Sequence, residues 1–150
     1  MDNIFKKSNK FEKLIVMYKN MADKGYKRKT GEFISPEKVY ADLEPARHKK
    51  YLKELFKKFE IKNVLDYGSG KGDWNTPLED GESLKNYLQI EKVFQYEPSL
   101  NKHKKIIRDC VLCFDVLEHV FVSDIAFVLH DIFSYATKLV VLNVACYKAA

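Results

Sequence analysis

The sequence predicts an α/β protein in which helices cover both faces of a parallel β-sheet. From Asn63 onward, short apolar runs alternate with segments of helical periodicity, which is the pattern of strand–helix–strand units. The first apolar run leads into the glycine-rich stretch VLDYGSGKG (Val64 to Gly72), a turn typical of ligand-binding sheets. The residues before it carry no strand signal. We therefore expect a helical N-terminal extension, residues 1–60, that packs on a core formed by residues 61–150, the two together making one structural domain.

The N-terminal extension is predicted to contain helices joined by a loop. Apolar residues recur at helical spacing in Lys10–Met21, and a second apolar stripe runs through Ala46–Phe59. Residues 22–36 contain two glycines and several polar residues, which indicates a loop. Ser35-Pro36 resembles a helix start, with serine as the N-cap and proline at the first helical position.

The core is predicted to contain four strands and two helices. The helices are expected at Glu82–Ile90 and Ser123–Thr137. A polar connection, residues 72–81, holds the only tryptophan, and the basic segment 101–108 is short. The predicted strands are Asn63–Tyr67, Lys92–Tyr96, Cys110–Val116 and Leu139–Ala145.

The composition is that of an ordinary globular protein. The chain has 150 residues, of which 46% are apolar and 31% charged. No apolar run is long enough to span a bilayer, and the N-terminus lacks the apolar core of a signal peptide. Three cysteines without a disulfide spacing suit a reducing compartment, so we expect a cytoplasmic protein.

Cys110-x-x-Cys113 has the spacing of a metal or redox motif, but it lies inside a predicted strand. Residues three apart in a strand point to opposite faces, so one metal ion would not reach both thiols. We therefore expect two small core residues and no metal site.

The net charge of +5 is unevenly distributed along the chain. Residues 1–60 contain 16 basic and 9 acidic side chains, whereas residues 61–150 contain 10 and 12. The basic extension either attracts an anionic partner such as nucleic acid or only forms the solvated faces of helices. The interleaving of lysines with apolar residues at helical spacing favours the second interpretation.

Polar residues follow three of the predicted strands. They lie in the stretches beginning at Asp66, at Tyr96 and at Asp115. The carboxyl ends of parallel strands share one edge of the sheet, and ligands bind there. Glu97 follows Asp66 by 31 residues, about one strand–helix–strand unit, where a carboxylate can accept from two ribose hydroxyls.

The glycine pattern favours a cationic nucleoside over a dinucleotide. Gly68, Gly70 and Gly72 form G-x-G-x-G instead of the dinucleotide fingerprint G-x-G-x-x-G. Asp66 precedes the glycines, and an acid at that place would repel a pyrophosphate and attract a cation. S-adenosylmethionine carries a sulfonium and an ammonium and no phosphate.

The stretches VLDYGSGKG, YEPS and CFDVLEHV together resemble the class I S-adenosylmethionine-dependent methyltransferases, over roughly residues 60–146. The short segment between the last two stretches, and YKNMADKG upstream, are most similar to small methyltransferase-like proteins of bacteria and phages. The resemblance implies a Rossmann-like sheet and S-adenosylmethionine as cofactor. It implies that Asp66 and the glycine loop hold the methionine end of the cofactor and that Glu97 holds its ribose. The candidate cofactor-binding residues are Asp66, Tyr67, Gly68, Ser69, Gly70, Gly72, Tyr96, Glu97, Pro98, Asp115, Val116 and Leu117.

Four further side chains have two interpretations each. Glu118 and His119 are the candidate catalytic residues, with His119 as general base, or they form hydrogen bonds with backbone near the cofactor. Tyr67 and Trp74 flank the ligand, or the tryptophan pins the glycine loop to the core.

The predicted sheet is incomplete for this family. A full sheet has seven strands, and after LVVLNVA no residues remain for the last two. The chain is then either a fragment or a minimal natural form. Its open sheet edge is covered by the N-terminal helices or pairs in a homodimer.

Three functions remain open on the sequence. The first is an S-adenosylmethionine-dependent methyltransferase of unknown substrate. The second is a protein that binds this cofactor without methyl transfer, as a partner subunit or by sequestering it. The third is an enzyme that cleaves the cofactor.

Overall fold

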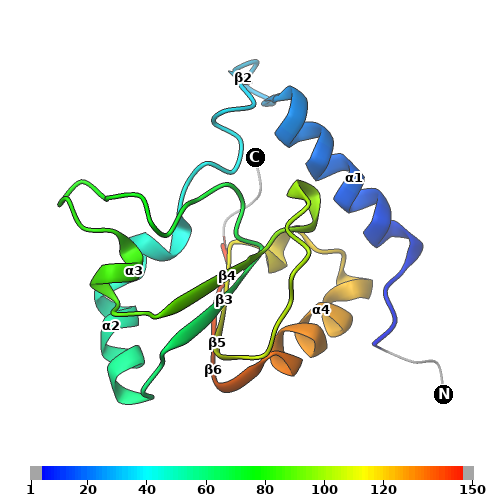
Figure 1. Ribbon diagram of the computed structural model, residues 1–150. Helices are drawn as coiled ribbons and strands as arrows, with labels where there is room; N and C mark the ends of the chain where they lie inside the picture. The colour runs from blue at the N-terminus through cyan, green and yellow to red at the C-terminus, as the bar shows by residue number, and fades with distance from the viewer. Residues whose placement is uncertain (1–4, 147–150) are drawn as a thin grey trace.

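Residues 5–146, the part of the chain described by the computed structural model, form a four-stranded parallel sheet with helices on both faces (Figure 1). The spatial order is β4-β3-β5-β6, and every neighbouring pair is parallel. The α/β class is therefore confirmed, and the arrangement is compatible with a Rossmann-like fold. The strands are β3 (Asn63–Tyr67), β4 (Lys92–Tyr96), β5 (Arg108–Phe114) and β6 (Ala136–Asn143).

The central strands β3 and β5 are continuously apolar because helices cover both of their faces. Val64, Leu65 and Leu112 have no exposed surface. Cys110 packs in the cluster on one face and Cys113 in the cluster on the other, as predicted from their spacing. Burial raises the pKa of both thiols above the ordinary value, which keeps them protonated.

One face of the sheet is covered by the 3₁₀ turn η1 (Glu44–His48), by α2 (Lys49–Lys58) and by α3 (Leu84–Tyr87). The buried stripe of α2 includes Leu52 and Phe56. Helix α3 is shorter than predicted: Ser83 caps its start, and a left-handed backbone at Gln89 (φ 56°) follows its end.

The other face is covered by α4 (Val122–Ser134) and α1 (Asn9–Lys24). Ser8 caps α1, and its backbone N–H and hydroxyl donate to the buried Asp124 carboxylate at 2.6 and 2.8 Å. These bonds anchor the N-terminal extension to α4. At 16 residues α1 is the longest helix within residues 5–146, and none of the helices there is long and apolar enough to cross a membrane.

Two predictions for the N-terminal extension were wrong. The expected loop contains a hairpin of β1 (Tyr26–Lys27) and β2 (Phe33–Ile34), which turns at Gly31 with φ 92°. Strands of two residues are too short to give a periodic signal. Ser35-Pro36 opens a turn instead of a helix, because the backbone at Tyr40 is left-handed (φ 54°) and the helical run cannot continue.

Strand boundaries were predicted well for β3 and β4 and less well for β5 and β6. Strand β5 ends before Asp115, whose φ of 52° turns the chain out of the sheet, and β6 begins earlier than predicted, at Ala136. The connection from β4 to β5 contains only the 3₁₀ turn η2 (Pro98–Leu100) and extended chain, which Lys105 ties to Asp131 of α4 at 2.7 Å. Strand β6 is an edge of the sheet, and the homodimer expected at that edge stays a prediction.

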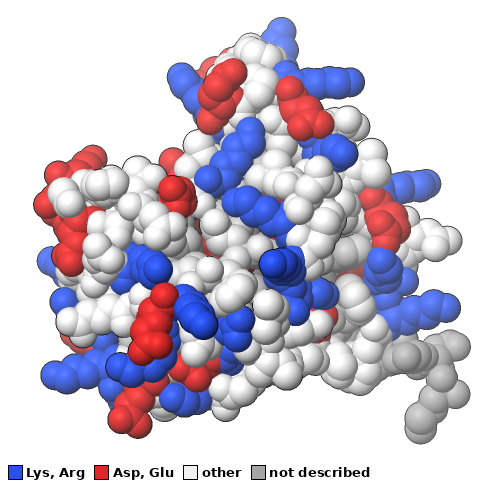
Figure 2. All heavy atoms as spheres, viewed as in Figure 1, with Lys and Arg blue, Asp and Glu red and all other residues white. Residues whose placement is uncertain are grey.

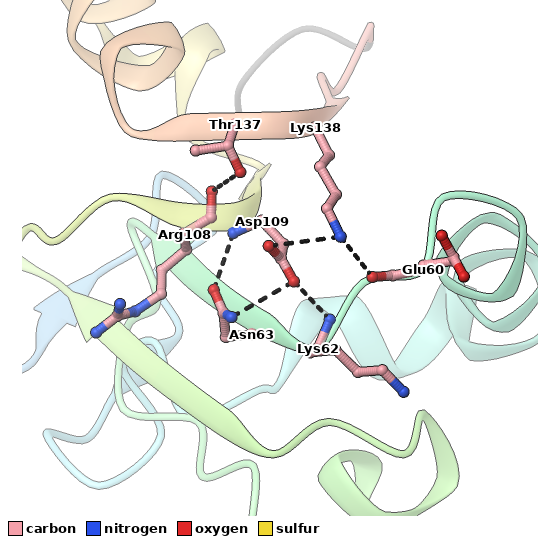
Figure 3. Close-up of polar contacts among 7 residues, drawn as sticks. All are labelled: Glu60, Lys62, Asn63, Arg108, Asp109, Thr137 and Lys138. Carbon is pink, nitrogen blue, oxygen red and sulfur yellow. Dashed lines mark hydrogen bonds and ion pairs between the residues drawn. The ribbon is translucent and has the colours of Figure 1, made fainter.

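The amino edge of the sheet is joined by a polar network around Asp109 (Figure 3). Its carboxylate accepts from the Lys62 N–H at 2.8 Å and from the Asn63 amide at 3.4 Å, and it lies 3.7 Å from the Lys138 ammonium. Lys138 also donates to the carbonyl of Glu60 at 2.9 Å. The network links β3, β5 and β6 where these strands begin.

Candidate functional site

The three polar strand ends meet at the carboxyl edge of the sheet, as predicted. Strand β3 lies between β4 and β5, so the chain leaves β3 on one side and returns on the other. This is the point in an open α/β sheet where a crevice forms between the loops. The glycine loop after β3, Glu97 after β4 and Asp115 after β5 flank this point.

The glycines of the loop are required by close approach of the protein's own chain. Gly68 has φ 80°, and a Cβ there would lie 2.2 Å from Val116 Cγ2. A Cβ at Gly70 would lie 2.8 Å from the carbonyl oxygen of Tyr40, and one at Gly72 would lie 2.9 Å from that of Asp42. The loop is therefore packed between Val116 and the N-terminal extension.

The backbone N–H groups of residues 68–71 all donate within the protein. Gly68 and Ser69 donate to the carbonyl of Tyr96, Gly70 to Glu97 and Lys71 to the carbonyl of Tyr40. Ser69 is itself buried. The loop can therefore shape a binding site, but these four N–H groups are not left over to donate to a ligand. Any charge that attracts a ligand comes from side chains.

Lys71 joins the glycine loop to the N-terminal extension by hydrogen bonds. Its ammonium donates to the carbonyl of Pro36 at 2.6 Å and to that of Ala22 at 3.1 Å. Lys102, on the other side, donates to the carbonyl of Gly70 at 2.9 Å. Both ammonium groups are thus engaged with backbone oxygens.

Asp66 is buried and held by Trp74, whose indole N–H donates to its carboxylate at 2.8 Å. Burial raises the pKa of Asp66 to about 6, although the Trp74 hydrogen bond and the Lys102 ammonium oppose the rise. Trp74 is only 1% exposed and packs in the core cluster under α2. Of its two interpretations, the one in which it pins the loop to the core is confirmed.

Glu97 joins the second strand end to the glycine loop. One carboxylate oxygen accepts from the Gly70 N–H at 3.3 Å, and the other accepts from the N–H and hydroxyl of Ser99. The side chain is half-buried, and Pro98 starts the η2 turn directly after it. The carboxylate is thus held in a fixed orientation beside the loop.

The third strand end carries a pair of acids that the sequence did not indicate. The Asp115 carboxylate accepts from the Asn143 amide at 2.8 Å. Glu44, in η1, lies beside Asp115: burial raises the pKa of Glu44, the Arg47 guanidinium opposes this, and Asp115 adds to the rise. Glu44 belongs to the extension, more than 70 residues earlier in the chain, so no local pattern pointed to it.

The candidate catalytic pair lies on η3 (Leu117–His119), just beyond Asp115. One Glu118 oxygen accepts from the Ala145 N–H at 3.0 Å. The other, Oε2, is buried and has no hydrogen-bond partner within residues 5–146. His119 is exposed, and its ring lies 5.9 Å from the ring of Tyr18 in an edge-on arrangement.

Two tyrosines from the extension complete the site, and sequence reasoning missed both. Burial, with the charges of Glu118 and Glu97, raises the pKa of Tyr18 to about 12. Burial also raises the pKa of Tyr40 above its usual range, and the two rings lie 5.6 Å apart. Tyr18 was visible only as part of the apolar stripe of a helix, and nothing in the sequence marked Tyr40.

Three predicted site residues have side chains directed to the opposite face of the sheet. The Tyr67 hydroxyl donates to Asp131 of α4 at 2.6 Å, and its ring lies 4.7 Å from that of Tyr96. Leu117 packs in the same cluster. The role of these residues in ligand binding stays a prediction. Because their side chains pack elsewhere, only their backbone atoms would contact a ligand.

Comparison with family models, with curated proteins and with solved structures gave no match. Within residues 5–146, no three histidine, cysteine or acidic side chains are grouped so as to hold a metal ion. The chemistry of the site is therefore judged from its own residues.

The site combines negative charge with aromatic rings. Carboxylates come from the ends of β3, β4 and β5, from η1 and from η3, and these five acids outnumber the three nearby cations, Lys71, Lys102 and Arg47. Such a surface attracts a cation, and the rings of Tyr18 and Tyr40 add favourable cation–π contact. The contributing acids are Glu44, Asp66, Glu97, Asp115 and Glu118.

Proposed function

We propose that the chain binds S-adenosylmethionine at the carboxyl edge of the sheet and acts as a methyltransferase. The observation that carries the proposal is the buried, unpartnered Oε2 of Glu118 within a group of carboxylates. An unsatisfied buried carboxylate oxygen is costly, and a cationic ligand would offset that cost. The cofactor is a cationic, phosphate-free nucleoside, which agrees with this charge.

The residues present fit such a ligand. Glu97 would accept from the ribose hydroxyls, because its carboxylate is already fixed beside the glycine loop. Asp66 and the loop from Gly68 to Gly72 would hold the methionine end. Asp115, Val116 and Leu117 would line the cofactor from the third strand end.

When bound, the cofactor supplies an electrophilic methyl group, which a nucleophile takes as the carbon–sulfur bond breaks and its electrons remain on sulfur. The protein's part is chiefly to hold the two reactants in line, which alone lowers the barrier strongly. His119, exposed at the mouth of the site, is suited to accept the proton that the acceptor loses and pass it to water.

A second candidate is binding without methyl transfer. It is favoured by the surroundings of His119, whose ring contacts Tyr18 and, within the described residues 5–146, has no carboxylate partner to orient it. Glu118, the other catalytic candidate, is partly used in accepting from Ala145. A partner subunit or a cofactor-sequestering protein would show the same site.

Calorimetry with S-adenosylmethionine and with its demethylated product tests binding first. Glu97→Gln removes the charge and is expected to weaken binding about tenfold or more. Glu91→Gln, an exposed change at the opposite end of β4, is the matched control and should leave the affinity unchanged. Absence of binding by the folded protein, or equal affinity in the two variants, would overturn the proposed site.

Mass spectrometry of the cofactor after incubation with cell extract separates the functions. Demethylated product supports methyl transfer. Unchanged cofactor supports binding alone, and thioether or lactone fragments support cleavage. Each result requires that calorimetry has shown binding.

A further inference from the structure

Helix α2 presents a lysine-rich surface to solvent. Its apolar side faces the core, and the exposed lysines lie on the remaining surface of the helix and just beyond its end. Figure 2 shows basic side chains, with acidic ones among them, at the lower left of the molecule, where Figure 1 draws α2. We call this surface the α2 lysine face; it comprises Lys50, Lys53, Lys57, Lys58 and Lys62.

The charge of the α2 lysine face is not neutralised by the protein. Within residues 5–146, none of its lysines forms an ion pair. By contrast, Lys49, Lys105 and Lys138 are each paired with an aspartate. Two exposed acids, Glu54 on α2 and Glu60 just after it, lie among the five lysines, so the net charge of this surface is +3 (five minus two). The face is therefore a positive potential that is available to an anion.

The lysines border a hollow with an apolar floor. The hollow has a volume of about 350 Å³ and an apolar floor that includes Phe56 and Leu88. Its polar lining consists of three lysines, one acid and one amide: Lys53, Lys57, Lys62, Glu60 and Gln89. A second hollow, of about 430 Å³, lies at the start of the helix beside Lys50 and Tyr51. Each is within the size range of a small-ligand site.

Aromatic rings are interleaved with the charges. Tyr51 is 59% exposed and Phe59 is 38% exposed, one near each end of α2. The Lys53 ammonium lies 4.3 Å from the centre of the Tyr87 ring. Flat exposed rings between ammonium groups match the alternation of bases and phosphates in a nucleic acid strand.

We propose that the α2 lysine face, with Tyr51, binds single-stranded nucleic acid. The phosphates would contact the lysines, and bases would stack on exposed rings or enter the hollows. A lipid surface fits less well, because Leu52 and Phe56 are buried and the exposed rings, Tyr51 and Phe59, lie at opposite ends of the helix and form no continuous apolar face. The proposal does not depend on the carboxyl-edge site, since it involves no residue of that site.

Fluorescence anisotropy with labelled oligonucleotides of about 12 nucleotides, without cofactor, tests the proposal. Separate DNA and RNA strands distinguish the two sources of the same chemistry. If four to five phosphates are contacted, log K falls with log salt with a slope of about −3. Lys53→Gln with Lys57→Gln should reduce the steepness of that slope by about 1.4.

The control for charge is Lys13→Gln with Lys19→Gln, two exposed lysines on α1, which should leave the slope unchanged. Tyr51→Ala should weaken binding about tenfold, whereas Phe33→Ala, an equally exposed ring on β2, should not. Circular dichroism verifies that each variant is folded.

Binding of either strand that responds to the α2 variants and not to the controls supports the proposal. Three results would overturn it: no binding of either strand at low salt, equal effects of test and control variants, or tighter binding of a duplex or of phosphatidylserine vesicles.

Discussion

At the amino edge of the sheet the Asp109 carboxylate accepts from Lys62 and Asn63, although Arg108 Nε there is buried without a hydrogen-bond partner within residues 5–146. At the carboxyl edge the buried atom without a partner in that part of the chain is a carboxylate oxygen, Glu118 Oε2. Acids are drawn toward their neutral form at the carboxyl edge, where the pKa values of Asp66 and Glu44 are raised.

The two edges therefore have different consequences for stability. Paired polar groups at the amino edge stabilise the fold, because removing one partner leaves the other buried without a hydrogen bond. At the carboxyl edge, Glu118 Oε2 is buried without a partner within residues 5–146, and burial raises the pKa values of Asp66 and Glu44. Such acids reduce stability in the absence of a ligand, which is a common property of binding sites. The predictions below test this contrast, from the largest expected effect to the smallest.

Gly68→Ala should cause the largest loss in the free energy of unfolding among these variants. It places a Cβ 2.2 Å from Val116 and forces a left-handed backbone at φ 80° on alanine. We expect the free energy of unfolding in urea to fall by about 4 kcal/mol. Gly31→Ala shares the positive φ but meets nothing within 4 Å, and should cost only about 1 kcal/mol. Equal losses would show that backbone strain alone, and not close packing at the carboxyl edge, requires Gly68.

The free energy of unfolding should depend on pH because the pKa of Asp66 is raised in the folded protein. Its folded pKa of about 6 lies above that of the unfolded chain, so the folded state binds more protons between about pH 4 and about pH 6. The contribution of Asp66 to stability therefore falls as pH rises through this window, by about 3 kcal/mol.

Asp66→Asn should remove that part of the pH dependence and keep an acceptor for Trp74. Fluorescence of the only tryptophan should titrate in the same window in the wild type and not in the variant. A wild-type titration near pH 4 would mean that Asp66 is hydrated in solution.

Asp109→Ala tests the amino edge. It removes the acceptor of the Lys62 N–H and the Asn63 amide and should lower the free energy of unfolding by about 2 kcal/mol. The affinity for S-adenosylmethionine should not change. Asp23→Ala, on the exposed side of α1, is the control and should leave stability within about 0.5 kcal/mol.

Glu118→Gln should change the free energy of unfolding least among these variants. The sign of that change distinguishes an acid kept for ligand binding from one that stabilises the fold. The amide still accepts from Ala145 and replaces a charged oxygen that has no partner, so stability should change by less than about 0.5 kcal/mol or rise. Calorimetry should nevertheless show weaker binding of S-adenosylmethionine. A loss of stability as large as that of Asp109→Ala would assign Glu118 to the framework.

Strands β3 and β4 were predictable because their signals are local. Strands β3 and β4 have the predicted bounds, since each is an apolar run that ends in residues unsuited to a strand. The opposite orientation of Cys110 and Cys113 followed from strand periodicity alone.

The extension's contribution to the site was not predictable because it depends on distant contacts. Tyr40 reaches the glycine loop, and Glu44 reaches Asp115, through packing that no sequence pattern encodes. Ser35-Pro36 had the right residues for a helix start, but the left-handed backbone at Tyr40 ends the turn. The sequence indicated the residues of the sheet's carboxyl edge and an N-terminal extension that packs on the core, but not which residues of the extension reach that edge.

Lys71 connects the N-terminal extension to the glycine loop, and this connection has a consequence for ligand binding. Its single ammonium contacts Ala22, in the last turn of α1 before the β1–β2 hairpin, and Pro36, just after the hairpin, while its backbone belongs to the glycine loop. Lys71 therefore joins both ends of the hairpin to the loop. By thermodynamic reciprocity, if a ligand at the loop changed the affinity of the hairpin for a partner, that partner would change the affinity for the ligand by the same factor.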